Sequence, residues 1–394
     1  MTETDTQIIN LLLELEEARR RGDPLTPEEL CRRTGCPDRL RKLEQALAVL
    51  RRSPLETGPG AHDPNDQPVA LSEAPAGGPP HARASVYRPG DEVVPAFRLK
   101  KFIARGGAGE VWQAEGPGGF PAALKLVHLG SPAGPAELRA AHSMRGVRHP
   151  NLLSVYGAWA VEGTLVLAME LAEETLQDLL KRARAGGKPG IDRAELLRHM
   201  EDAARGLDFL NHARHEVDGK PRVRIMHRDV KPQNLLLVGG AVKIGDFGLA
   251  RLLDETLATV TGGLTAGYAP PELFRRKVAP GSDQYSLAVT YCYLRTGRLP
   301  FDGDPLQMMY AHMHAAPDLS ALPRRERAVI ARALAKDAED RWPSCTAFVA
   351  ALKRACRPRR RLALGLMMFL FGLIVGAGTT VAITAGMSRW LIRP

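Results

Sequence analysis

The stretch IMHRDVKPQNLLLVGGAVKIGDFGLA, residues 225–250, carries the strongest signal in this chain. A His-Arg-Asp triplet ends on Asp229, with Lys231 and Asn234 after it, and a Gly-Gly turn leads to Asp246 in an Asp-Phe-Gly triplet. Phosphoryl transfer needs a carboxylate for the attacking hydroxyl, a carboxylate and an amide oxygen for Mg²⁺, and a lysine that neutralises phosphate charge. Both blocks at this spacing are too specific for chance, so they predict a phosphoryl-transfer site.

Two weaker motifs lie upstream of this stretch. In FIARGGAGEVWQA, residues 102–114, Gly106, Gly107 and Gly109 stand between two short β-prone pieces. A turn this rich in glycine lets backbone N–H groups approach phosphate oxygens, although by itself such a turn is more often structural. In AALKLV, Lys125 interrupts a buried strand pattern, which indicates either an outward charge at a sheet edge or a buried cation with an anionic partner.

Together these motifs resemble those of the eukaryotic-type (bacterial) serine/threonine protein kinase family, over residues 88–357. An extended basic loop at 211–226 and the stretch LLSVYGAWAVEG resemble membrane-anchored kinases of planctomycete-type bacteria. The resemblance implies an α+β, two-lobed fold, with an antiparallel sheet and a helix in the N-lobe and a mainly helical C-lobe. It also implies ATP and Mg²⁺ (or Mn²⁺) as cofactors and phosphorylation of serine and threonine hydroxyls on protein substrates.

The resemblance also implies roles for individual residues. Asp229 is similar to the catalytic base, and Lys231 to the lysine of the serine/threonine-type catalytic loop. Asn234 and Asp246 are similar to the metal ligands, and Lys125 to the strand lysine that binds the α- and β-phosphates. The other implied cofactor-binding positions lie in the Gly-rich loop, the neighbouring strands and the hinge: Ala104, Gly106, Gly107, Gly109, Val111, Ala123, Met169 (the gatekeeper), Glu170, Ala172 and Leu236.

Two positions depart from the family pattern. Ala104 stands where the first glycine of the loop is usual, and Glu137 lies about one turn earlier than the usual partner of the strand lysine. Glu137 is the only acidic residue between Lys125 and His149, so we expect it to pair with Lys125. The departures leave open a second hypothesis, a nucleotide-binding pseudokinase that scaffolds partners. A third, suggested by the basic N-terminal helices, is a membrane-bound DNA-binding regulator.

The segment after Asp-Phe-Gly resembles an activation segment. Arg228, next to the base, is satisfied by a phosphate in this family, which implies autophosphorylation, although a polar loop explains the same threonines. The candidate residues are Thr256, Thr259 and Thr261, with Thr265 at the substrate-docking end. Three further residues are expected to be architectural rather than chemical. Glu272 should pair with Arg341, and Asp283 should cap the catalytic-loop backbone.

Composition divides the 394 residues into five segments. They are a small helical module at 1–52, a Pro/Gly-rich linker at 53–87, the kinase-like domain at 88–357, an apolar run at 362–387 and a short tail at 388–394. In the first segment, Thr26 and Glu29 around Pro27 form a capping-box pattern, which marks a helix start. The linker has too few large apolar residues to offset chain entropy, so we expect it to be flexible.

The apolar run at 362–387 predicts a transmembrane helix, because it contains no charged side chain. A helix of about 26 residues spans roughly 39 Å, against a hydrocarbon core of about 30 Å. Arginines cluster before the run and are sparse after it, which favours a single-pass protein of the cytoplasmic (inner) membrane with a cytoplasmic kinase domain and an extracytoplasmic tail. Gly372 and Gly376 favour a homodimer through this helix, or simply face lipid.

Composition excludes little else. The formal net charge of +10 suits nucleic acid, anionic lipid or acidic substrates, and charge alone does not choose between them. For a membrane-tethered chain we expect a protein-interaction role for residues 1–52 rather than nucleic-acid binding. The five cysteines form no CxxC pair, which favours a reducing compartment and argues against a cysteine metal site.

Overall fold

The computed structural model describes residues 11, 14–15, 25–35, 40–41, 44, 85–106, 109–131, 134–144, 146–212, 214–217, 220–247, 251–252, 266–275, 277 and 279–357. The chain forms two compact units, Met1–Leu352 and Lys353–Pro394. The described elements belong to the first unit, except for the last turn of the final helix.

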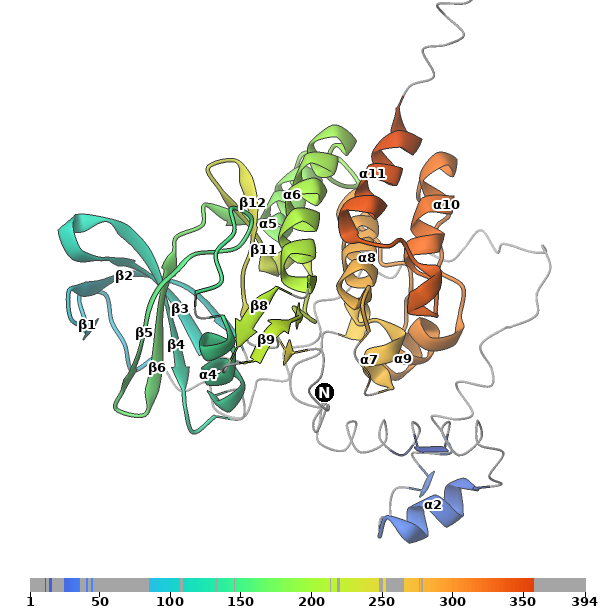
Figure 1. Ribbon diagram of the computed structural model, residues 1–394, viewed down its shortest axis with the longest axis horizontal. Coiled ribbons are helices and arrows are strands. Elements are labelled where there is room, and N and C mark those ends of the chain that lie inside the picture. Colours follow the sequence, from blue (N-terminus) through green and yellow to red (C-terminus); the bar gives the residue numbers. More distant parts are fainter. Residues whose placement is uncertain are drawn as a thin grey trace, which may run out of the picture. The chain divides into compact units, whose positions relative to one another are not determined.

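An antiparallel sheet of six strands forms the N-lobe, in the order β1-β2-β3-β4-β6-β5 (Figure 1). The strands are β1 (Glu92–Val94), β2 (Phe97–Gly106), β3 (Gly109–Glu115), β4 (Pro121–His128), β5 (Val155–Val161) and β6 (Thr164–Glu170). Because side chains alternate along a strand, the sheet has two apolar faces. Leu124 and Val166 belong to the core of one face, whereas Leu165 and Leu167 on the other pack near Ala141 of helix α4 (Gly134–Ser143).

Helices dominate the C-lobe, which lies at the other end of the domain from the sheet (Figure 1). They are α5 (Leu176–Ala185), α6 (Arg193–Asn211), α7 (Pro271–Phe274), α8 (Ser282–Thr296), α9 (Pro305–His314), α10 (Arg324–Ala333) and α11 (Cys345–Cys356). Helix α8 is buried along nearly its whole length and ends at Gly297, whose φ of 73° is the left-handed conformation that glycine adopts without strain. Helix α6 begins at Asp192, whose carboxylate accepts from two backbone N–H groups of the first turn.

Short antiparallel strand pairs complete the C-lobe. One sheet has the order β12-β11-β7, and two further pairs are β10-β13 and β8-β9. The strands are β7 (Glu174–Thr175), β8 (His215–Val217), β9 (Lys220–Val223), β10 (Ile225–Met226), β11 (Leu235–Val238), β12 (Ala241–Ile244) and β13 (Arg251–Leu252). The β11-β12 hairpin carries Asn234 and Asp246 just outside its two ends.

The two-lobed fold expected from the sequence, with an antiparallel N-lobe sheet and a helical C-lobe, is therefore confirmed. The prediction of an extended loop throughout 211–226 is wrong, because strands β8 and β9 within this range form an antiparallel pair. His215 of β8 connects this strand pair to the end of α6. Its Nε2 donates to the carbonyl oxygens of Phe209 and Leu210, at 2.8 and 3.1 Å.

The predicted transmembrane segment, 362–387, lies outside the described residues. Within the part of the chain that the structure describes, no helix combines the length and the apolar character that a membrane crossing needs. Near the N-terminus, helix α2 (Pro27–Arg33) begins after Thr26, whose hydroxyl accepts from the backbone N–H of Glu29 at 3.3 Å. This contact matches the predicted capping pattern.

His312 of α9 makes the stability of the C-lobe depend on pH. Its side chain is fully buried, and burial, together with the nearby positive charge of Lys336, lowers its pKa to about 3. The unfolded chain takes up this proton near pH 6.5, but the folded chain does so only near pH 3. Stability from this residue is therefore present above pH 6.5 and is lost as the pH falls toward 3.

For each unit by which the pH falls within this window, we expect His312 to lower the free energy of unfolding by up to about 1.4 kcal/mol. Urea denaturation at several pH values between about 7 and 4 measures the slope. The His312→Phe variant should have a shallower slope, whereas His128→Asn, a change at an exposed histidine, should leave it unchanged. Equal slopes for the wild type and His312→Phe would contradict the assignment.

Candidate active site

A buried aspartate in α8 fixes the backbone of the segment that contains Asp229. The carboxylate of Asp283 accepts from the N–H groups of His227, at 2.9 Å, and Arg228, at 2.8 Å. Burial raises the pKa of Asp283, although the nearby His227 and the two N–H donors oppose that shift. His227 Nε2 also donates to the carbonyl oxygen of Gly245 at 2.9 Å. This contact joins the His-Arg-Asp segment to the Asp-Phe-Gly segment.

The Asp229 carboxylate is held by two neighbours on its own loop. Its Oδ2 accepts from Lys231 Nζ at 2.8 Å and from Asn234 Nδ2 at 2.9 Å. The same Asn234 amide donates to the Asp229 carbonyl oxygen at 2.8 Å. Asp229 is 8% exposed, so these bonds form with little competition from water. The arrangement leaves a fixed carboxylate beside a lysine, which suits a group that accepts a proton next to a phosphate.

Asn234 and Asp246 lie at adjoining ends of the β11-β12 hairpin. Leu235 pairs with Ile244, and the Gly245 N–H donates to the Asn234 carbonyl oxygen at 3.0 Å. Carboxylate and amide oxygens are hard ligands that suit Mg²⁺, so the two side chains fit the metal implied by the sequence. The described residues contain no group of three or more His, Cys, Asp or Glu side chains that could hold a metal. Mg²⁺ usually binds through one or two protein side chains and completes its shell with water molecules and substrate phosphate oxygens, which is compatible with this pair.

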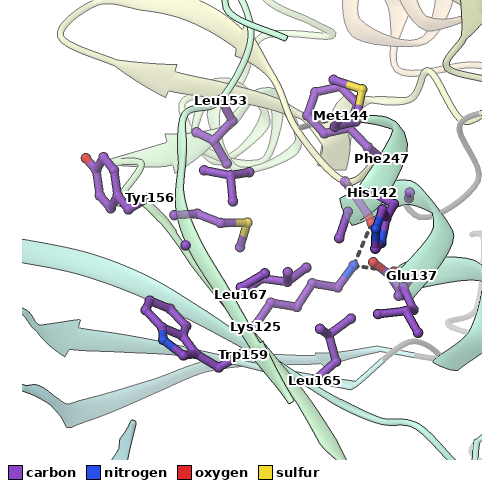
Figure 2. A pocket seen from close by; sticks show the side chains of 18 of the residues that line it. Lys125, Glu137, His142, Met144, Leu153, Tyr156, Trp159, Leu165, Leu167 and Phe247 are labelled. Carbon is purple, nitrogen blue, oxygen red and sulfur yellow. Dashed lines mark hydrogen bonds and ion pairs between the residues drawn. The ribbon is translucent and has the colours of Figure 1, made fainter. Parts of the chain in front are cut away.

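Lys125 of β4 lies between two carboxylates from distant parts of the chain. Its Nζ is 2.5 Å from Glu137 Oε1 of α4 and 2.7 Å from Asp246 Oδ1 (Figure 2). Burial works to lower the pKa of Lys125, but the two carboxylates outweigh it and the pKa is raised. Burial raises the pKa of Glu137, whereas the Lys125 charge outweighs burial and lowers the pKa of Asp246. Lys125 is thus a buried cation, which settles the choice that its strand pattern left open.

The Glu137→Gln substitution tests whether this carboxylate positions Lys125 for a phosphate. Hydrogen bonds to charged groups contribute about 1.5–3 kcal/mol, so we expect kcat/KM for phosphoryl transfer to fall roughly 10-fold to 100-fold. Steady-state kinetics with ATP as the varied substrate measures this change. The control is Glu162→Gln, at an exposed turn between β5 and β6. Unchanged kinetics in Glu137→Gln would show that Asp246 alone positions the lysine.

A cavity of about 590 Å³ lies between α4 and strands β5 and β6, next to this ion pair. Figure 2 shows Lys125 and Glu137 at its polar end, with Leu165, Leu167 and Trp159 among the apolar residues around them. Four of the predicted site residues line it: Lys125, Glu137, Met169 and Asp246. The other predicted site residues that the structure describes are not among its lining residues, so for the described part of the chain this cavity is the lysine end of the expected nucleotide site.

The other predicted nucleotide positions surround Lys125 on neighbouring strands. Val111 pairs with Lys125 and with Ala104, and Ala123 pairs with Met169. Gly109 has a φ of 144°, and a Cβ there would lie 2.1 Å from the Leu126 carbonyl oxygen, so the tight turn requires glycine. The remaining described positions of the set belong to the Gly-rich hairpin, the hinge and strand β11: Gly106, Glu170, Ala172 and Leu236.

Five predicted positions lie outside the described residues: Gly107, Thr256, Thr259, Thr261 and Thr265. The expected architectural pair is present, because both guanidinium N–H groups of Arg341 donate to the Glu272 carboxylate, at 2.7 and 2.8 Å. Sequence reasoning missed one polar contact of the hinge. Lys243 Nζ lies 2.8 Å from the Glu170 carboxylate, and the strand alternation around Lys243 was the only signal for it.

The protein kinase domain family matches residues 97–359, about two thirds of the sequence, and the chain belongs to this family. The chain is similar to serine/threonine-protein kinase PknA of Mycobacterium tuberculosis, with 34% identity over 285 residues, or 67% of this chain and 63% of the relative. PknF of the same organism is 30% identical over 282 residues, or 65% and 55% of the two chains. The leucine-rich repeat receptor protein kinase MSL1 of Oryza sativa is 40% identical over 224 residues, or 53% and 15%. The chain spans less than two thirds of the length of each relative.

Proposed function

We propose that this protein transfers the γ-phosphate of ATP to serine and threonine hydroxyls of proteins. The observation that carries the proposal is the fixed Asp229 carboxylate, held by Lys231 and Asn234. Asp246, which forms an ion pair with Lys125, lies on the Asp-Phe-Gly segment. The hydrogen bond from His227 to Gly245 connects that segment to the segment that contains Asp229. The similarity to bacterial kinases whose names specify serine and threonine supports the choice of hydroxyl.

In this mechanism the substrate hydroxyl oxygen attacks the γ-phosphorus, and the bond from that phosphorus to the bridging oxygen of ADP breaks. Asp229 accepts the hydroxyl proton, and Lys231 beside it offsets negative charge on the transferred group. Lys125 binds phosphate oxygens from the N-lobe side. Asn234 and Asp246 would hold Mg²⁺, which supplies neutralisation of the phosphate charge. Asp283 keeps the loop backbone in place throughout.

Incubation of the full chain with radiolabelled ATP, Mg²⁺ and a general protein substrate tests the activity. Acid hydrolysis of the labelled protein should release phosphoserine and phosphothreonine and no phosphotyrosine. Nucleotide binding without transfer would instead favour the pseudokinase hypothesis.

Mass spectrometry of the chain itself tests the second part of the proposal, autophosphorylation at Thr256, Thr259 or Thr261. Label confined to other positions would exclude these sites.

A membrane anchor at 362–387 forms the third part of the proposal, supported by the charge-free composition of that run and by its arginine-rich flank. The finer resemblance to membrane-anchored planctomycete-type kinases points the same way. We expect the full chain to sediment with membranes and to require detergent for release. Two arginines placed at Leu373 and Ile374 should move it to the supernatant, because each costs about 2.5–3.5 kcal/mol at a helix centre. Arginines at Leu391 and Ile392, outside the run, are the control, and release of the unaltered chain by salt alone would contradict the anchor.

A further inference from the structure

The described residues near the N-terminus (11, 14–15, 25–35 and 40–41), which we call the N-terminal segment, share an apolar core with the C-lobe. One buried cluster combines Leu11, Leu30 and Cys31 from the N-terminal segment with Ala269, Phe274, Met309 and Met313 from the C-lobe. Three partly buried side chains of the same segment pack against it: Leu15, Leu25 and Leu40. Both sets of residues belong to the compact unit Met1–Leu352.

The burial of Leu30 and Cys31 needs more than their own helix. Helix α2 has only seven residues, yet Leu30 is fully buried and Cys31 is 1% exposed. On the C-lobe side, Met309 and Met313 are one helical turn apart on α9, so they lie on the same face of that helix. Methionine side chains are flexible and fill irregular gaps, which suits a surface that receives another helix.

The cluster includes residues that follow the predicted substrate-docking position, Thr265, in the sequence, and it does not include the proposed catalytic groups. Ala269 lies two residues before the first residue of the short helix α7, and Phe274 ends that helix. Neither Asp229 nor Lys125 belongs to the cluster. Both residues keep their ion pairs in this structure, in which the cluster is formed. The apolar packing is therefore compatible with an assembled catalytic centre.

We propose that the N-terminal segment, as defined by these described residues, is an intramolecular docking module. It occupies the α7–α9 face, defined by Ala269, Phe274, Met309 and Met313, and closes that face to other proteins. A substrate or regulator that uses the face must displace the module first. This inference concerns binding within the chain and holds whether or not phosphoryl transfer is observed.

The Cys31 thiol is a native reporter of docking. In the full chain we expect N-ethylmaleimide to label Cys31 slowly. Peptide mass spectrometry at successive times measures the labelling rate. Met313→Asp on α9 should accelerate labelling about fivefold or more, the lower end of typical coupling between sites. The control Ala328→Asp places the same carboxylate at an exposed position of α10 and should leave the rate unchanged. Continued protection of Cys292, buried in α8, shows that the C-lobe of the variant is folded.

Unchanged labelling of Cys31 in a folded Met313→Asp variant would overturn the proposal, because the thiol would then be covered without α9. If Met313→Asp also exposes Cys292, the C-lobe of that variant is not folded and its Cys31 labelling is not informative. A second experiment, with a substitution in the N-terminal segment, then tests the proposal. Leu30→Asp in the full chain should speed hydrogen exchange about fivefold or more in residues 266–275 and 305–314. Glu28→Ala, at an exposed position of the same helix, should not. Unchanged exchange in Leu30→Asp would also overturn the docking module.

Discussion

Replacing Asp229 by asparagine should lower kcat for phosphoryl transfer by about 100-fold to 10,000-fold, the usual contribution of a general base. Asparagine has the same shape and can still accept from Lys231 and Asn234, which hold the native carboxylate at 2.8 and 2.9 Å. It cannot take the proton of the attacking hydroxyl. ATP affinity should change by less than about threefold, because Lys125, the proposed phosphate-binding residue, is untouched.

Three measurements separate this role from a structural one. Single-turnover transfer gives the chemical step, equilibrium nucleotide binding gives the affinity, and thermal melting reports the fold. Asp302→Asn makes the same chemical change at an exposed position in the loop before α9 and should leave all three unchanged. If Asp229→Asn kept most of the wild-type rate, Asp229 would be a positioning residue, and the proposed mechanism would lose its proton acceptor.

The residues of the candidate site could be located from sequence because their order along the chain is itself specific. The triplet that ends on Asp229, the amide of Asn234 and the Asp-Phe-Gly triplet lie within about 20 residues, and the β11-β12 hairpin brings their ends together. Lys125 was harder, since an isolated lysine in a strand pattern fits an edge as well as a core. Only its resemblance to the family motif favoured the buried site.

What could not be predicted depends on packing between distant segments. The Lys125–Asp246 contact joins residues 121 positions apart, and no local pattern marks Asp246 as a partner of that lysine. The apolar side chains of Leu165 and Trp159 line the cavity but look like ordinary core residues in sequence. The apolar cluster that contains both Leu30 and residues of α9 could not be predicted for the same reason. In the sequence, the apolar residues of each segment are typical of a core within that segment alone.

Arg341→Ala should lower the free energy of unfolding by about 3–5 kcal/mol, the usual cost of removing one partner from a buried ion pair. Arg341 is 2% exposed and Glu272 is 8% exposed, so the substitution leaves a carboxylate without its cation in a dry site. The guanidinium also donates to the carbonyl oxygens of Gly281 and Ala335, at 3.1 and 2.9 Å. These acceptors lose their partner as well, which places the expected loss toward the upper end.

Urea denaturation of the full chain, followed by tryptophan fluorescence, measures the loss. Arg324→Ala, at an exposed position at the start of α10, is the matched control and should cost less than about 0.5 kcal/mol. The double variant Glu272→Gln with Arg341→Met removes both charges together. It should recover part of the loss, because the dominant cost of the single variant is the carboxylate left buried and unpaired rather than the absence of attraction. If Arg341→Ala unfolded at the same urea concentration as Arg324→Ala, the Glu272 carboxylate would have to be hydrated, contrary to its burial. The ion pair would then not stabilise the contact between α7 and the segment that precedes α11.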